Sequence, residues 1–252
     1  MKLPFRKGRS GMLPAGERLY AIGDIHGRLD LFEALIAKIE TDNAERGPAK
    51  TQIVLLGDLI DRGAESAGVV EHARCWNADF AEIEALLGNH EASLLAVLEG
   101  ETRWLESWLG YGGRETLLSY GMPGDLLWRG SMPEIAEAVQ TYVPDAHKAW
   151  LTDRPLSLRR GGYLFAHAGI RPGRKLDDQE PKDLLWIRSE FLDSEADHGA
   201  VIVHGHSISP QPEDRHNRIG IDTGAYFSDT LTALGLEAGE RWFIQSQGEH
   251  AS

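Results

Sequence analysis

The chain of 252 residues has a single cysteine and no long apolar run. Cys75 has no partner for a disulfide within the chain, so a reducing compartment, the cytoplasm, is the expected location. We expect Cys75 to be a small buried residue rather than a nucleophile. No stretch approaches the roughly 18 apolar residues of a membrane span. No apolar segment follows the basic N-terminus as in a secretory signal, so we expect neither a membrane partner nor export.

Basic residues are also few, since 26 Lys and Arg stand against 39 Asp and Glu and the net charge is −13. A nucleic-acid partner would select a basic face, so we expect none. Part of the basic charge lies in residues 1–17, which we expect to form a flexible arm. Neither a Walker A pattern nor G-x-G-x-x-G occurs, so a nucleotide-cradling loop is not supported.

The chain does contain a repeated unit of apolar strand, polar turn and helix. The expected strands are 18–22, 51–56 and 81–87, and the helices that follow them are 29–40, 65–76 and 91–99. This alternation predicts an α/β fold with parallel strands and crossover helices. Ligands of such folds collect at the carboxyl ends of the strands, which is where the polar turns lie.

The remainder of the chain departs from this repeat. Residues 100–150 are rich in Trp and Gly, and we expect a helical cap whose aromatic side chains either pack against the sheets or form a wall facing the substrate. After residue 154, short strands and tight loops predict a second, mixed or antiparallel sheet that faces the first. Its expected strands are 156–167, 200–204, 218–222 and 230–236. We expect one domain over residues 18–243 and a mobile tail over 244–252.

Metal-binding and proton-handling side chains follow the apolar runs. The segments are GDIHG (23–27), GDLIDRG (57–63), GNHE (88–91) and HAG (167–169), with HGH (204–206) as a fifth candidate. Together they supply carboxylate oxygen, imidazole nitrogen and amide oxygen, a donor set that suits divalent manganese, iron or zinc. Two ions that share one carboxylate also suit in-line displacement at phosphorus. The motifs therefore predict a metal centre for phosphate chemistry.

Each motif residue alone has an ordinary explanation. Asp24 could cap the helix that follows, Asp61 could pair with the adjacent Arg62, and His167 could be a satisfied core histidine. Glu91 could serve only as a negative charge at a helix N-terminus. Only the combination of the segments in this order favours a functional site.

Some of these positions allow a choice between roles. Asp58 has two carboxylate oxygens and could hold two ions. Asn89 and His90 are adjacent and point in different directions, which suits one ligand and one free proton carrier. Of the last two histidines we select His206 as the ligand, because a glycine places it in the turn, and we assign His204 either to packing or to the support of a ligand from behind.

The segments GDIHG, GDLIDRG and GNHE resemble the three signature motifs of the phosphoprotein phosphatase family of metallophosphoesterases, most closely the bacterial branch that includes the bacteriophage lambda phosphatase. The segments LLWIR (184–188), HGHS (204–207) and IDTGAYF (221–227) extend the resemblance over roughly residues 18–236. It implies a calcineurin-like metallophosphoesterase fold, a two-layer β-sandwich flanked by helices, with residues 100–150 as a helical cap.

The resemblance also implies a binuclear centre of two divalent ions, Mn²⁺ with Fe²⁺ or Zn²⁺ as alternatives. One ion would be held by Asp24, His26 and Asp58, and the other by Asp58, Asn89, His167 and His206. His90 would be the proton donor, oriented by Asp61. The substrate phosphate would be bound by Arg62 and Arg188, with Asn89 beside them.

The implied function is metal-dependent phosphomonoester hydrolysis, as a serine/threonine protein phosphatase acting on a phosphoprotein or a small phosphorylated substrate. The first alternative is a symmetrical diadenosine tetraphosphate hydrolase, which has most of the same motifs. Those enzymes tend not to keep both the Asp of D-R-G and the Glu of N-H-E, so Asp61 and Glu91 favour the protein phosphatase. A remote alternative is a non-catalytic metal-binding scaffold, which would have no use for the proton donor His90.

Overall fold

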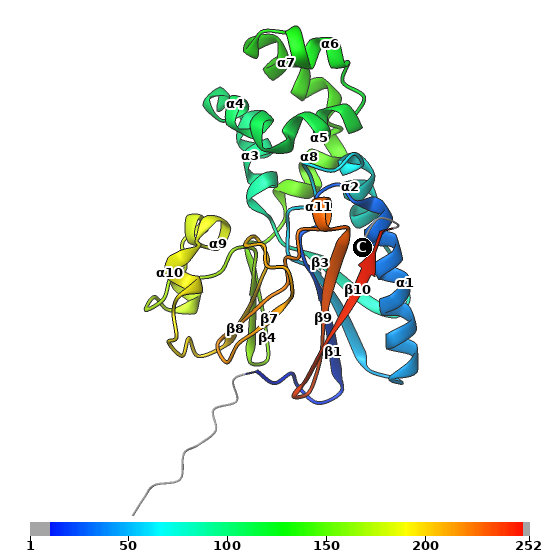
Figure 1. The fold of residues 1–252 in the computed structure, drawn as a ribbon, viewed down its shortest axis with the longest axis vertical. Helices are drawn as coiled ribbons and strands as arrows, with labels where there is room; N and C mark the ends of the chain where they lie inside the picture. Colours follow the sequence, from blue (N-terminus) through cyan, green and yellow to red (C-terminus); the bar gives the residue numbers. More distant parts are fainter. Residues whose placement is uncertain (1–10, 249–252) are drawn as a thin grey trace, which may run out of the picture.

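Two five-stranded sheets face each other in the computed structural model, which describes residues 11–248 (Figure 1). The first sheet has the order β10-β9-β1-β2-β3 and the second β4-β5-β6-β8-β7. The first contains β1 (Glu17–Ile22), β2 (Lys50–Leu55), β3 (Ala81–Ala85), β9 (Thr230–Glu237) and β10 (Glu240–Gln247). The second contains β4 (Ser157–Arg160), β5 (Tyr163–Ala166), β6 (Val201–His204), β7 (Glu213–Asp214) and β8 (Arg218–Gly220). The predicted two-layer sandwich is confirmed.

Parallel pairing brings the strand ends of each sheet to one edge. In the first sheet β1, β2 and β3 are parallel, and in the second β5, β6 and β8 are parallel. The crossover helices of the first sheet are α1 (Leu29–Glu45) and α2 (Ser66–Cys75), and α3 (Asn89–Leu98) follows β3 and leads into the helical insertion. The polar motifs therefore follow strands whose carboxyl ends lie together.

Side-chain alternation explains why β1 is apolar over residues 19–22. Leu19 and Ala21 pack between the two sheets with Phe165 and Val203 of the second sheet. The intervening residues of β1, such as Tyr20, pack on the opposite face with the helices. A strand that is buried on both faces is read from sequence as a continuous apolar run.

Short helices cover the outer face of the second sheet. They are η3 (Leu176–Asp178), α9 (Pro181–Trp186) and α10 (Ser189–Leu192), and α11 (Ala225–Ser228) precedes β9. Leu184 and Phe191 pack there against Leu164 and Ile202. Helices thus flank both sheets, as the sequence predicts.

A helical insertion occupies residues 102–152 and stands above the sandwich in Figure 1, drawn in green. Its segments are η1 (Thr102–Trp104), α4 (Leu105–Trp108), η2 (Leu109–Gly113), α5 (Arg114–Ser119), α6 (Gly124–Arg129), α7 (Met132–Tyr142) and α8 (Asp145–Thr152). It packs on α2 and α3, the helices that follow two of the polar motifs. The insertion is therefore attached directly to the segments that carry those motifs.

The C-terminal segment differs from the expectation. Residues 244–247, expected in a mobile tail, form the second half of β10, in which Ser246 pairs with Leu231. Residues 230–236 were expected in the second sheet, but β9 lies beside β1 in the first. The sequence prediction failed because residues 245–247 are polar, and an edge strand is held by backbone pairing rather than by an apolar pattern. Residues 249–252 lie outside the described residues.

Three smaller expectations also need correction. The helix α1 continues to Glu45 rather than ending at residue 40. Cys75 is exposed at the end of α2, where its Sγ lies 3.3 Å from a Glu71 oxygen, because the buried face of that helix is formed by residues such as Val69 and Ala73. Of the expected arm, residues 1–10 lie outside the described range, whereas Leu13 is buried and its N–H donates to the Ala238 carbonyl at 2.8 Å.

None of the helices between residues 11 and 248 has the length and apolar character needed to cross a membrane.

We predict that Gly235→Ala destabilises the fold. Gly235 of β9 lies opposite Trp242 of β10, and an added Cβ would lie 2.1 Å from the Trp242 ring. That ring also donates from Nε1 to Asp42 of α1 at 3.0 Å, so its displacement should loosen α1 as well. Overpacking of this kind costs about 1–3 kcal/mol of unfolding free energy. Denaturant unfolding measures it, with Gly110→Ala as control because no atom lies within 4 Å of an added Cβ there. Equal losses in both variants would contradict this packing.

Candidate metal centre

Side chains from both sheets converge on Asp58, which is almost completely buried. The segments that bring them are the turns after β1, β2, β5 and β6 and the start of α3. The residues placed there are Asp24, His26, Asp58, Asn89, His90, His167 and His206. The structure therefore brings together every residue that the sequence motifs nominated as a metal ligand.

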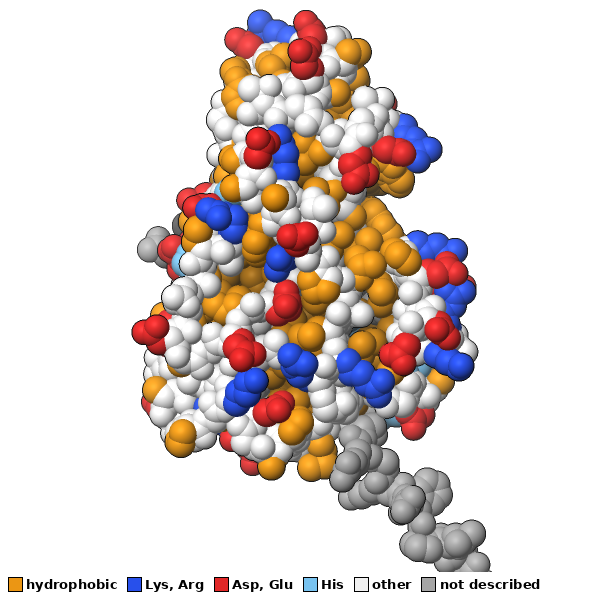
Figure 2. Space-filling view, turned by 180° about the vertical axis from the view of Figure 1, so that it is seen from behind, with side chains coloured by type: hydrophobic (Ala, Val, Ile, Leu, Met, Phe, Trp, Pro, Cys, Tyr) orange, Lys and Arg blue, Asp and Glu red, His pale blue; other side chains and the backbone are white. Residues whose placement is uncertain are grey.

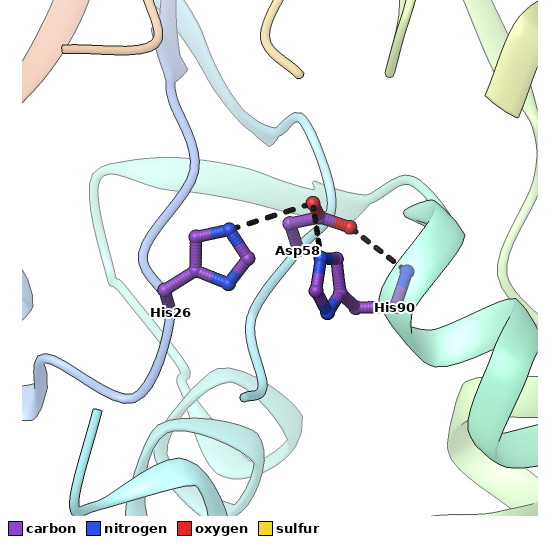
Figure 3. A group of neighbouring side chains, drawn as sticks. All are labelled: His26, Asp58 and His90. Atoms are coloured by element: carbon purple, nitrogen blue, oxygen red, sulfur yellow. Dashed lines mark hydrogen bonds and ion pairs between the residues drawn. The ribbon is translucent and has the colours of Figure 1, made fainter. Parts of the chain in front are cut away.

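The Asp58 carboxylate lies among histidine nitrogens, two of which Figure 3 shows. Its Oδ2 is 3.6 Å from His26 Nε2 and 3.8 Å from His90 Nε2, and its Oδ1 is 3.4 Å from His167 Nε2. The ligand atoms of His26, Asp58 and His90 all lie within 4.8 Å of one another, and so do those of Asp58, His167 and His206. Asp58 is the member that the two groups share.

Backbone carbonyls orient two of these histidines. His26 Nδ1 lies 2.8 Å from the Ile60 carbonyl, and His167 Nδ1 lies 3.0 Å from the Leu56 carbonyl. A carbonyl only accepts, so each Nδ1 carries a proton and each Nε2 presents a lone pair toward Asp58. Burial lowers the pKa of His26 to about 3, which keeps its ring neutral as metal binding requires.

The surroundings of His167 Nε2 suit a bound cation. This lone pair faces Asn89 Oδ1 at 2.8 Å as well as Asp58 Oδ1 at 3.4 Å. Three acceptors that point at one another are repulsive unless a cation or proton lies among them. This arrangement fits a divalent cation held by nitrogen and oxygen donors.

Crowded carboxylates give a second indication. Asp24 Oδ2 accepts the His206 N–H at 2.9 Å, but Asp24 Oδ1 and His206 Nε2 are buried without a hydrogen-bond partner among residues 11–248. Burial, then the charges of Asp222 and Asp58, raise the pKa of Asp24 well above its usual range. Burial also raises the pKa of Asp222 to about 6. A bound cation would favour the ionised carboxylates and contact the two partnerless atoms.

The backbone at the site is strained in the way that functional sites often are. Five non-glycine residues there have positive φ, between 47° and 74°: His26, Asp58, Asp61, Arg62 and His206. Gly205 is needed before the last of them, because a Cβ at residue 205 would lie 1.9 Å from Asp24 Oδ1. The structure thus gives the glycine in this turn a steric role.

The two late histidines have different surroundings. His206 lies in the Asp58 group, whereas the His204 ring lies edge-on to Phe191 with ring centroids 5.1 Å apart. His204 Nδ1 is 3.0 Å from the Gly205 carbonyl. These contacts agree with the selection of His206 as the candidate ligand and of His204 for packing.

Asp61 orients His90, the candidate proton donor, and is itself held by two further hydrogen bonds. His90 Nδ1 lies 2.5 Å from Asp61 Oδ2, and Asp61 is fully buried. Burial alone would lower the pKa of His90, but Asp58 and Asp61 outweigh it and raise this pKa to about 9. Trp108 Nε1–H donates to Asp61 Oδ2 at 2.8 Å, and the Thr116 hydroxyl donates to Oδ1 at 2.6 Å. Sequence analysis missed both donors, because they belong to the insertion and form no motif.

Glu91 has a larger role than the sequence analysis gave it. Its carboxylate accepts four backbone N–H groups, those of Asp58 (2.9 Å), Leu59 (2.8 Å), Ile60 (3.1 Å) and Gly88 (2.9 Å). Burial raises the pKa of Glu91 to about 7, but only the anion accepts all four donors together. The sequence does contain one indication of this role: Glu91 lies three residues after Gly88, which is the spacing of a capping box.

A cavity of about 420 Å³ opens above Asp58. Arg62 and Arg188 both line it, and neither forms an ion pair with a carboxylate among the described residues. The Arg62 guanidinium lies over the Tyr226 ring, 4.6 Å from the centroid, and its Nη2 lies 3.3 Å from His90 Nε2. Both arginines are therefore free to bind an anion.

Comparisons with known proteins agree with this geometry. The family model described as "Calcineurin-like phosphoesterase" matches residues 17–229. A symmetrical bis(5'-nucleosyl)-tetraphosphatase of Methylococcus capsulatus is 32% identical over 61% of this chain and 44% of its own length. The serine/threonine-protein phosphatase 1 of Salmonella typhimurium is 28% identical over 87% of this chain and 92% of its own length.

The fold also occurs in solved structures. A crystal structure of a candidate diadenosine tetraphosphatase has a TM-score of 0.63 at 20% identity and covers 98% of this chain and 97% of its own. At that identity the likeness supports the fold alone. The chain spans less than half the length of the curated tetraphosphatases that it matches.

We predict that Glu91→Gln weakens both the fold and metal binding. The amide offers one acceptor where four N–H groups need two, and its NH₂ group faces backbone donors. Loss of a hydrogen bond to a charged group costs about 1.5–3 kcal/mol. The free energy of unfolding measured in urea should therefore fall by about that amount. The control is Glu99→Gln, which alters an exposed residue at the other end of α3. Unchanged stability of Glu91→Gln would show that the loop at residues 58–60 does not depend on this carboxylate.

Proposed function

The chain belongs to the calcineurin-like phosphoesterase family and is a metallophosphoesterase, and we propose that the residues around Asp58 hold two divalent cations for hydrolysis at phosphorus. The observation that carries this proposal is the convergence of Asn89 Oδ1 and Asp58 Oδ1 on the lone pair of His167 Nε2, because a cation bound among these three acceptors would relieve their mutual repulsion. Asp24 Oδ1, which is buried without a hydrogen-bond partner among the described residues, supports the proposal of a cation beside Asp24.

The proposed ligands divide into two groups that share Asp58. One cation would contact Asp24, His26 and Asp58, and the other Asp58, Asn89, His167 and His206. Such cations polarise the phosphoryl oxygens and lower the pKa of water. Because the donors are oxygen and imidazole nitrogen without cysteine, we propose Mn²⁺, with Fe²⁺ and Zn²⁺ as alternatives.

The remaining polar residues would handle the proton and the phosphate. His90 lines the cavity and would give its proton to the leaving group, with Asp61 at 2.5 Å stabilising the imidazolium. Asp61 would fix the orientation of that ring. Arg62 and Arg188, with Asn89 beside them, would bind the phosphate oxygens.

For the substrate we propose symmetrical dinucleoside tetraphosphates. The tetraphosphatase relatives favour this alternative over the protein phosphatase that Asp61 and Glu91 suggested from sequence. The cavity supports it, because Trp104, Tyr111 and Trp186 expose aromatic surface beside the candidate phosphate site. Phosphoserine proteins are the second candidate, favoured by the Salmonella phosphatase that this chain matches over nearly its whole length.

We predict that metal removal abolishes hydrolysis of p-nitrophenyl phosphate and that Mn²⁺ restores it. Asp58→Asn should bind less metal than Asp24→Asn and lose turnover, because Asp58 belongs to both proposed ligand groups. The matched control is Asp153→Asn, which changes an exposed carboxylate in the same way. Metal content by elemental analysis, together with kcat, gives the result. Undiminished activity in excess chelator, or a full complement of metal in Asp58→Asn, would refute the assignment.

We predict that diadenosine tetraphosphate is cleaved to ADP with a kcat/KM at least about tenfold above that for a phosphoserine peptide. The aromatic walls can contact a nucleobase, and a stacked base contributes roughly a factor of ten or more in affinity. Chromatography of the products, with Mn²⁺ present, measures both rates and the symmetry of cleavage. The opposite ratio would instead identify the protein phosphatase.

A further inference from the structure

The cavity above Asp58 continues into a second, more open groove of about 790 Å³. The groove runs along α9 and the start of α10, and its lining includes Lys182, Ile187 and Glu190. Three residues line both spaces: Trp104, Trp186 and Arg188. A molecule whose phosphate lies at Asp58 can therefore extend past these three residues without leaving the protein surface.

The two shared tryptophans belong to different parts of the fold. Trp104 ends η1 in the helical insertion, and Trp186 ends α9 beside the second sheet. Both are substantially exposed, at 40% and 44%. In Figure 2 hydrophobic side chains lie along the waist between the insertion and the sandwich. Aromatic surface of this kind binds flat rings by stacking.

The positive charge of Arg188, which lines both the cavity and the groove, favours a flat ring that is attached to an anionic group. Arg188 lies between the cavity and the groove and forms no ion pair with any residue in the described range. Arg171, which also lines the groove, pairs instead with Asp183 at 2.7 Å and with Glu190 at 2.5 Å. A free guanidinium beside two indoles suits a flat base joined to phosphate.

We propose that Trp104, Trp186 and Arg188 form a nucleotide subsite that holds one nucleoside diphosphate half of the substrate. The base lies on the tryptophans, Arg188 binds the phosphates that lead to the base, and the ribose faces the outer groove. This inference rests on the proposed function, because the phosphate that reacts must lie at Asp58. The subsite adds selectivity for a base to a centre that by itself recognises only phosphate.

Inhibition of p-nitrophenyl phosphate hydrolysis tests the subsite without using its own substrate. ADP and inorganic pyrophosphate are compared as inhibitors at constant free Mn²⁺. In the wild-type enzyme ADP should inhibit with a Ki at least about tenfold below that of pyrophosphate, since stacking of a base contributes about that factor. Equal Ki values would overturn the proposal while leaving the phosphoesterase activity intact. Absence of p-nitrophenyl phosphate hydrolysis would instead refute the proposed function and, with it, the subsite.

Substitution of the tryptophans tests whether they are the residues that bind the base of ADP. Trp104→Ala and Trp186→Ala should each raise the Ki of ADP about fivefold or more and leave that of pyrophosphate within twofold, whereas Trp186→Phe should retain most of the affinity for ADP. The matched control is Trp128→Ala, because Trp128 is 66% exposed in the same insertion but lines neither space. Equal changes for both inhibitors, or a loss in Trp128→Ala as large as in Trp104→Ala, would overturn the assignment. So would variants that lose only phosphoserine peptide hydrolysis, which would make the groove a peptide site.

Discussion

The buried carboxylate of Asp58 is the constraint on which the site depends. It lies where strand ends of both sheets meet, and the nitrogens of three histidines face it within 3.8 Å. A carboxylate in such a place is costly unless positive charge compensates it. The neutral tautomers of His26 and His167 do not supply that charge, because their Nδ1 protons are directed at backbone carbonyls. His90, whose pKa is raised, brings a positive charge only toward Oδ2, at 3.8 Å, and we propose that a cation on each side of Asp58 completes the compensation.

The helical insertion serves this centre in two ways. From its buried side Trp108 and Thr116 donate to Asp61, which in turn contacts His90. From its exposed side Trp104 and its neighbours form one wall of the cavity. Of the two possibilities that the sequence left open, packing is realised by Trp108, whereas the wall facing the substrate stays a prediction that the position of Trp104 beside the cavity supports. If His90 is the proton donor and the substrate lies in this cavity, as we propose, the insertion links the choice of substrate to the chemistry.

Much of this arrangement could be predicted from the sequence, because the motif residues are short-range signals at strand ends. The alternation of strands and helices predicted the parallel strands of the first sheet, and the short strands after residue 154 predicted a second sheet facing it. The glycine before His206 favoured it over His204 as the candidate ligand. Contacts between distant segments could not be predicted. The capping-box spacing of Glu91 indicates only its bond to the Gly88 N–H and not those to residues 58–60, and Trp108 resembles any other core aromatic residue. The strand β10 was missed because backbone pairing at a sheet edge leaves no apolar period in residues 245–247.

Anomalous diffraction from crystals grown with Mn²⁺ tests the central claim most directly, because it locates the ions independently of activity. The account predicts two peaks that flank the Asp58 carboxylate. One should lie beside Asp24 and His26, and the other beside Asn89 and His167. A single peak, or peaks that leave Asp58 without a cation at saturating Mn²⁺, would contradict it.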